Sequence, residues 1–111
     1  MEKERADCAY IAVTTNDHYR LGGLCVNLSE PVLCEKAMFQ NSEEAKNLYA
    51  LASEKKIFVM EALWSRYLPA VQQVKRWVEQ EKIGKPTVLQ CNIGFLAPDE
   101  KENRYFNPKL G

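Results

Sequence analysis

Polar side chains that could take part in chemistry follow three apolar runs of the sequence, at residues 8–13, 32–34 and 57–60. The candidates that follow them are Thr14, Thr15, Asn16 and His18, then Glu35 and Lys36, and finally Glu61, Trp64 and Arg66. If the runs are parallel strands of an open α/β sheet, their carboxyl ends meet at the edge where such sheets bind ligands. Lys36 is then placed to donate a hydrogen bond or, when desolvated, to transfer a proton.

Each candidate also has an ordinary structural interpretation. Glu35 and Lys36 can simply begin a solvated loop, because both residue types are usually exposed. His18 can be a residue of a helix start that is bonded to the backbone, and Trp64 can be an aromatic anchor of a core. The coincidence of three strand ends, more than any single residue, favours a ligand site.

Two helices are expected between the apolar runs. Apolar residues at helical spacing predict the first over about 17–28 and the second after an N-cap at Asn41 or Ser42. The first helix contains the pair Gly22–Gly23, where each Gly costs about 1 kcal/mol relative to Ala. This helix therefore needs tertiary support.

A third helix and a fourth strand are expected after residue 60. The helix should begin at Pro69 and end at Gly84, and a longer strand should follow over 87–95. The order is then β-α-β-α-β-α-β, and the first three strands are expected to be parallel. These three strands are continuous apolar runs, and such runs suit strands that are buried on both faces. Three parallel strands with open edges are expected to be part of a larger sheet.

Composition limits the classes of function. The chain has 111 residues, enough for one domain at most, and 46% of them are apolar, which suffices for a core. Lys+Arg and Asp+Glu both total 15, which argues against a nucleic-acid partner. No stretch approaches transmembrane length and the charged N-terminus has no apolar leader, so we expect a cytoplasmic protein without a membrane partner.

Cysteine spacing and glycine spacing exclude several kinds of site. The four cysteines form no CxxC pair and three lie in apolar runs, which predicts buried reduced thiols and no metal site. The sequence contains no GxSxG, GxGxxG or GxxxxGK[ST] motif. If a nucleotide binds here, its pyrophosphate cradle is not in this chain.

Four segments carry a resemblance to a known family. AYIAVTTNDHY, PVLCEKAMFQNSEEA, IFVMEALWSRYLPAV and EKIGKPTVLQCNIGF resemble the glucose–fructose oxidoreductase/inositol dehydrogenase (Gfo/Idh/MocA) family, over about residues 7–111. The resemblance implies an α/β fold: the C-terminal part of a Rossmann-type parallel sheet followed by the first strand of an α/β substrate domain. Residues 1–80 would be the C-terminal half of a NAD(P)-binding Rossmann domain, and 81–111 the start of the substrate and dimerisation domain.

The resemblance also implies an activity. It is the transfer of a hydride between NADP (or NAD) and the hydroxyl carbon of a dihydrodiol or of a sugar such as D-xylose, in a homodimeric enzyme. Glu35 and Lys36 fall on the family's Glu-Lys-Pro motif, whose lysine lies beside the nicotinamide and the substrate and assists hydride or proton transfer. Lys36 is thereby the implied catalytic residue, and both residues are implied cofactor contacts.

The other implied cofactor contacts lie at the ends of the first and third apolar runs. They are Tyr10, Val13, Thr14 and Asn16 under the adenosine and ribose, His18 on the histidine of a T-P-x-x-x-H segment, and Trp64 and Arg66 on a Trp-x-Arg segment near the nicotinamide. The sequence departs from the family pattern at Ala37, which replaces the motif proline, at Val13–Thr14, which replaces Thr-Pro, and at Gly22–Gly23.

Two functions remain open at this point. In the first, the chain is a fragment of a dehydrogenase that on its own has no measurable activity, because the family's phosphate loop lies upstream of it and a further catalytic segment downstream. In the second, the chain is a non-catalytic truncated isoform or pseudoenzyme that acts by association with a partner sheet.

Overall fold

The computed structural model describes residues 6–100 and 103–110 and divides the chain into two units. The first unit is Met1–Ala62 together with Asp99–Gly111, and the second is Leu63–Pro98. The boundary that the family resemblance implies at residue 80 stays a prediction.

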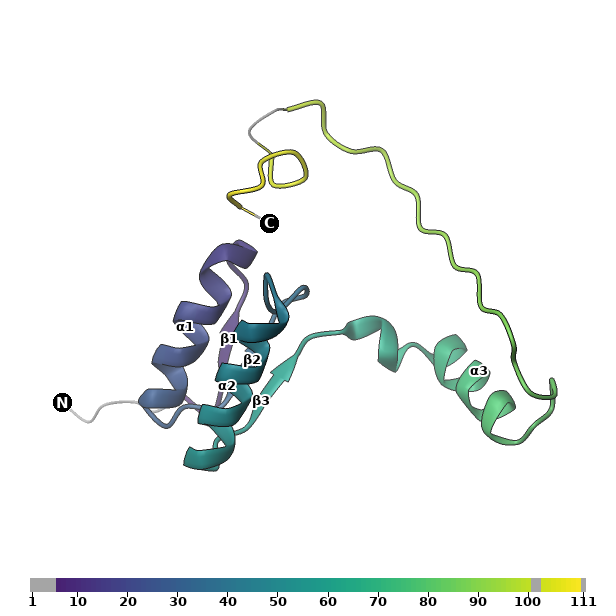
Figure 1. Ribbon diagram of the computed structural model, residues 1–111, viewed down its shortest axis with the longest axis horizontal. Coiled ribbons are helices and arrows are strands. Elements are labelled where there is room, and N and C mark those ends of the chain that lie inside the picture. The colour runs from purple at the N-terminus through teal and green to yellow at the C-terminus, as the bar shows by residue number, and fades with distance from the viewer. Residues whose placement is uncertain (1–5, 101–102, 111) are drawn as a thin grey trace. The chain divides into compact units, whose positions relative to one another are not determined.

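The first unit is built on a three-stranded parallel sheet. Its strands are β1 (Ala9–Ile11), β2 (Val32–Cys34) and β3 (Val59–Glu61), in the order β1-β2-β3. Helices α1 (Thr15–Asn27) and α2 (Ser42–Lys55) connect the strands and lie on one side of the sheet (Figure 1). The predicted α/β class with a Rossmann-like parallel sheet is confirmed.

The sheet is buried on the face that the two helices cover. Ile11, Val32 and Cys34 point into a core that also contains Val26 of α1 and Leu48 of α2. On the opposite face Tyr10 of β1 is 59% exposed, because successive side chains of a strand point to opposite faces. The expectation of a strand buried on both faces is therefore wrong for β1 in this unit.

The burial of each cysteine also depends on whether another element covers it. Cys34 is buried under the helices, Cys25 is half-buried, and Cys8 and Cys91 are exposed. The expectation of buried thiols holds only for Cys34, because an apolar run buries a side chain only where another element covers it.

The ends and contacts of α1 and α2 have local causes. The Asn41 side chain caps α2 by accepting hydrogen bonds from the backbone N–H groups of Glu43 and Glu44, at 3.1 and 3.0 Å. In α1, Gly22 is buried, and a Cβ built there would lie 2.8 Å from Cδ2 of Leu48. The missing side chain lets α1 and α2 approach closely, and this packing supplies the tertiary support that the two glycines require.

The second unit contains a 3₁₀ turn, η1 (Trp64–Tyr67), and helix α3 (Pro69–Glu79). The helix begins at Pro69 as predicted but ends five residues before Gly84. Glu81 takes a left-handed conformation, φ 55°, and its N–H bonds to the carbonyl of Val78 at 3.1 Å, which closes the helix. None of the helices in the described part of the chain is long and apolar enough to cross a membrane.

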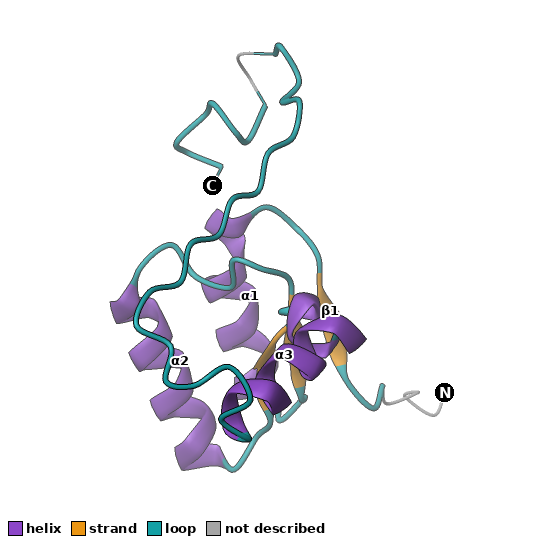
Figure 2. Cartoon of the chain, turned by 90° about the vertical axis from the view of Figure 1, so that its right-hand side faces the viewer, coloured by secondary structure: helices purple, strands orange, loops and turns teal. Residues whose placement is uncertain are grey.

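The strand expected over 87–95 is not formed. Residues 86–98 have neither helix nor strand and are drawn as loop in Figure 2. Ile93, for example, is 93% exposed. The expectation is wrong because a strand is held by hydrogen bonds to a neighbouring strand, and the second unit offers none in its described residues.

Candidate functional site

The candidate site lies at the carboxyl ends of the three strands in the first unit. The parallel register places Ile11, Cys34 and Glu61, the last residues of their strands, side by side. Helices α1 and α2 both begin just after this edge, so the positive ends of their dipoles lie close to it. Such an edge favours negatively charged ligands.

Glu35 is held by two hydrogen bonds. One carboxylate oxygen accepts from the hydroxyl of Tyr10, and the other accepts from the backbone N–H of Lys36 at 3.1 Å. Tyr10 and Glu35 meet because Tyr10 pairs in register with Leu33, and Glu35 lies on the same face two residues later. The Tyr10 hydroxyl, and then the Lys36 N–H, lower the pKa of Glu35, while the same bond raises the pKa of Tyr10.

The side chain of Lys36 is exposed. Within residues 6–100 and 103–110 its ammonium group has neither a hydrogen bond nor an ion pair. The Lys36–Ala37 peptide bond is cis; in the family's motif a proline stands at the position of Ala37. A hollow of about 160 Å³ lies beside this peptide bond, lined by Thr15, Lys36, Ala37, Arg104 and Tyr105. The exposed lysine is therefore accessible to a ligand in this hollow.

His18 is buried beneath this loop, with only 2% of its surface exposed. Nδ1 lies 3.1 Å from the carbonyl oxygen of Ala37, and Nε2 lies 3.0 Å from the carbonyl oxygen of Val13. This geometry corresponds to the structural interpretation of a histidine bonded to backbone. A direct contact between His18 and the cofactor stays a prediction.

The loop after β2 is also fixed from β3 and α2. Oε1 of Glu61 accepts a hydrogen bond from the backbone N–H of Met38 at 2.9 Å, and Met38 is buried. The ring of Phe39 packs edge-on against Tyr49 of α2, with 5.9 Å between centroids. Loop residues on both sides of the Lys36–Ala37 peptide are therefore anchored.

Cys34 is buried directly before the loop. Burial, followed by the negative charges of Glu35 and Glu61, raises the pKa of its thiol to about 11. The thiol is therefore protonated at neutral pH and unsuited to act as a nucleophile. Its role here is to fill the core.

The remaining predicted residues are distributed over both units. Thr14 precedes α1 without a side-chain cap bond, and Asn16 is exposed in the first turn of α1. Trp64 and Arg66 are exposed in the second unit, whereas Tyr10, Val13, His18, Glu35 and Lys36 are brought together in the first. The sequence analysis missed the carbonyl of Ala37 and the N–H of Met38, because backbone groups leave no signal in residue type.

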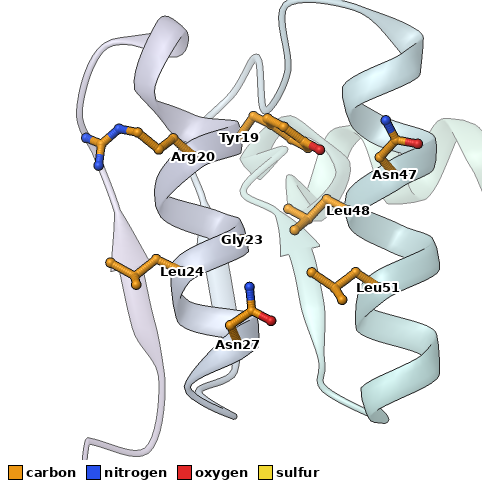
Figure 3. Close-up of a pocket in the computed structure, with 8 residues that line it drawn as sticks. All are labelled: Tyr19, Arg20, Gly23, Leu24, Asn27, Asn47, Leu48 and Leu51. Atoms are coloured by element: carbon orange, nitrogen blue, oxygen red, sulfur yellow. The ribbon is translucent and has the colours of Figure 1, made fainter.

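In the described part of the chain, no group of three or more His, Cys, Asp or Glu side chains is arranged to hold a metal ion. A larger hollow, about 410 Å³, lies between α1 and α2 (Figure 3). It is lined by Tyr19, Arg20, Gly23, Leu24, Asn27, Asn47, Leu48 and Leu51, and none of the residues predicted for the site is among them.

A parallel sheet with helix N-termini and polar groups at its carboxyl edge is the architecture of a dinucleotide-binding domain. The model of the oxidoreductase family with an NAD-binding Rossmann fold, Gfo/Idh/MocA, matches residues 1–63. The chain belongs to this family.

Two curated relatives and one solved structure show how the similarity is distributed. The chain is 36% identical over 88 residues to trans-1,2-dihydrobenzene-1,2-diol dehydrogenase of Sus scrofa, covering 79% of this chain and 26% of the relative. It is 33% identical over 112 residues to D-xylose 1-dehydrogenase (NADP(+)) of Hypocrea jecorina, covering 94% of this chain and 29% of the relative. An oxidoreductase from Agrobacterium radiobacter, solved with NAD+, L-tartaric acid and magnesium, superposes with a TM-score of 0.67 at 26% identity, covering 72% of this chain and 23% of that one. The chain thus spans between a quarter and a third of the length of these curated relatives.

Proposed function

We propose that this chain supplies the nicotinamide-facing edge of an NADP-dependent dehydrogenase that acts on a dihydrodiol or on a sugar such as D-xylose. The observation that carries the proposal is the exposed side chain of Lys36 just after the central strand, on a loop held by Glu35 and Glu61. Dihydrodiol and D-xylose dehydrogenases among the relatives support the substrate class.

The residues of this edge fit the nicotinamide half of a cofactor. A bound nicotinamide cofactor supplies or takes up the hydride at the substrate carbon. Lys36 would donate a hydrogen bond to the reacting hydroxyl oxygen and so stabilise negative charge that develops there. Glu35 would keep the Lys36 backbone in place, since its carboxylate accepts from the Lys36 N–H.

The same proposal includes the other expected contacts between the chain and the cofactor. Tyr10, Val13, Thr14 and Asn16 would lie under the adenosine and ribose, and Trp64 and Arg66 would approach the nicotinamide end. The name of the Hypocrea jecorina relative favours NADP, whereas the family description names NAD. Homodimeric assembly and a cytoplasmic location complete the proposal and rest on the family resemblance.

Calorimetric titration with NADPH tests whether Lys36 also contacts the cofactor, as the family resemblance implies. We expect the 111-residue chain to bind NADPH, and Lys36→Met to weaken binding roughly 10- to 150-fold, the loss expected for one hydrogen bond from a charged group. Lys55→Met is the matched control: Lys55 lies in the last turn of α2, which runs back to the opposite end of the sheet. Equal affinities of the two variants would contradict the proposal, and a parallel titration with NADH decides between the cofactors.

A second measurement concerns turnover. Because the sequence holds no GxGxxG phosphate loop, we expect the purified chain to reduce no NADP with D-xylose or a dihydrodiol. Formation of reduced cofactor by the chain alone would overturn this expectation.

A non-catalytic role through a partner sheet is the second candidate. The observation that favours it is the face of the sheet that α1 and α2 leave uncovered, where Tyr10 and, just before β3, Phe58 are both exposed. In this case the chain should associate with itself or with another sheet in sedimentation experiments. A compact monomer that unfolds cooperatively would contradict this candidate.

A further inference from the structure

His18, the only histidine of the chain, lies in an unusual arrangement for a buried ring. Both ring nitrogens are within hydrogen-bonding distance of backbone carbonyl oxygens, Ala37 at 3.1 Å and Val13 at 3.0 Å. The first carbonyl belongs to the loop that carries Lys36, and the second to the turn between β1 and α1. The imidazole therefore joins two loops at the edge of the sheet.

The chemistry of the two partners restricts the state of the ring. A carbonyl oxygen can only accept a hydrogen bond, and a neutral imidazole has a single N–H. A neutral His18 can therefore bond to one carbonyl and turns a lone pair toward the other. Only the ring with both protons donates to Val13 and Ala37 together.

We propose that His18 is the positioning residue of Lys36. Its buried imidazole ties the carbonyl of Ala37 to that of Val13. The importance of this tie for cofactor binding rests on the function proposed for Lys36, but the tie itself does not.

Several titratable groups lie on the elements packed around the ring. They are Asp17 beside it in α1, Glu35 and Lys36 on the loop after β2, Glu61 at the end of β3, and Tyr49 on α2. Among them, the pKa of Glu35 is lowered first by the Tyr10 hydroxyl, then by the Lys36 N–H, and further by the positive charges of Lys36 and His18. Signals of the ring itself are therefore a more direct test of the tie than the charges around it.

Nuclear magnetic resonance of the wild-type chain, labelled with ¹⁵N in the imidazole, tests the tie directly because one histidine gives one set of ring signals. We expect the ring N–H protons that donate to these carbonyls to be protected from exchange with solvent, because the ring is buried. Ring protons in fast exchange with water would overturn the proposal.

Two variants separate the two ties. The side-chain amide nitrogen of Asn lies where Nδ1 of histidine lies, and that of Gln lies where Nε2 lies, so His18→Asn can keep the bond to Ala37 and His18→Gln the bond to Val13. The readout is hydrogen exchange at the N–H of Met38, which lies in the same loop as Ala37 and is bonded to Glu61 of β3. We expect His18→Gln to speed this exchange roughly 2- to 12-fold, the effect of losing one ordinary hydrogen bond, and His18→Asn to leave it near the wild-type rate.

Equal exchange rates in the Asn and Gln variants would overturn the assignment to Ala37. If neither variant folds, the wild-type resonance measurement still decides. A Lys36→Met variant that binds NADPH normally would refute the proposed function while leaving the tie intact, so the two failures can be told apart.

Discussion

The contact between α1 and α2 predicts different outcomes for two adjacent glycines. A Cβ at Gly22 would lie 2.8 Å from Cδ2 of Leu48, whereas a Cβ at Gly23 would meet nothing within 4 Å. Leu48 is only 1% exposed and points from α2 toward α1 (Figure 3), so its side chain must shift to admit a methyl group at Gly22. Alanine should therefore be tolerated at Gly23 and resisted at Gly22.

The magnitude follows from two opposing contributions to the free energy of unfolding. Alanine is favoured over glycine inside a helix by about 0.8–1 kcal/mol, and this gain applies to both positions. Overpacking of a filled core costs typically 1–3 kcal/mol, and this cost applies only at Gly22. We expect Gly23→Ala to stabilise the chain by up to about 1 kcal/mol, and Gly22→Ala to be about 1–3 kcal/mol less stable than Gly23→Ala.

Urea unfolding followed by far-ultraviolet circular dichroism measures the difference, since helix propensity cancels between the two variants. A double variant supplies the control: Leu48→Ala should cost about 2–5 kcal/mol in the wild-type chain and clearly less beside Gly22→Ala, because the added methyl group fills part of the cavity. Equal stability of the Gly22→Ala and Gly23→Ala variants would refute the close approach of the two helices at this point.

Two further predictions concern titratable groups. Tyr10→Phe should raise the pKa of Glu35 toward its ordinary value, seen in a carboxyl ¹³C titration, because the hydroxyl is the largest cause that lowers it; an unchanged titration would contradict the bond. Because the pKa of Glu35 is lower in the folded than in the unfolded chain, the ionised carboxylate stabilises the fold at pH values above the unfolded pKa. This stabilisation is lost as the pH falls through the folded pKa, and the Tyr10→Phe variant should lose less stability over this range. At about pH 8 the thiol of Cys34, with a pKa of about 11, should be alkylated more slowly than the exposed Cys8 and Cys91. Peptide mass spectrometry measures the three rates, and equal rates would argue against the burial of Cys34.

Local signals in the sequence predict much of the fold. The bounds of β2 follow from a short apolar run that two charges end, and the start of α3 follows from Pro69 at a first helical position. The end of α3 could not be predicted in this way, because the first left-handed residue after the helix is Glu81, and Gly84, which also has a positive φ, comes three residues later. The strand expected over 87–95 failed for a different reason, since its pattern suits a strand only where a partner strand is present.

The sequence likewise predicts some features of the candidate site and not others. The positions of Glu35 and Lys36 follow from the rule that ligands bind at the carboxyl ends of parallel strands. The bond between Tyr10 and Glu35 depends on the register of β1 and β2, which periodicity alone does not fix. The partners of His18 are carbonyl oxygens, and any residue type provides one, so their identity is visible only in three dimensions.

A resonance titration of the ¹⁵N-labelled chain with reduced nicotinamide mononucleotide shows where on the chain the nicotinamide binds. We expect shifts concentrated at the amides of residues 13–16 and 35–38, and their loss in Lys36→Met but not in Lys55→Met. Shifts centred on the hollow between α1 and α2, or no shifts at saturating ligand, would contradict the claim that this edge of the sheet receives the cofactor.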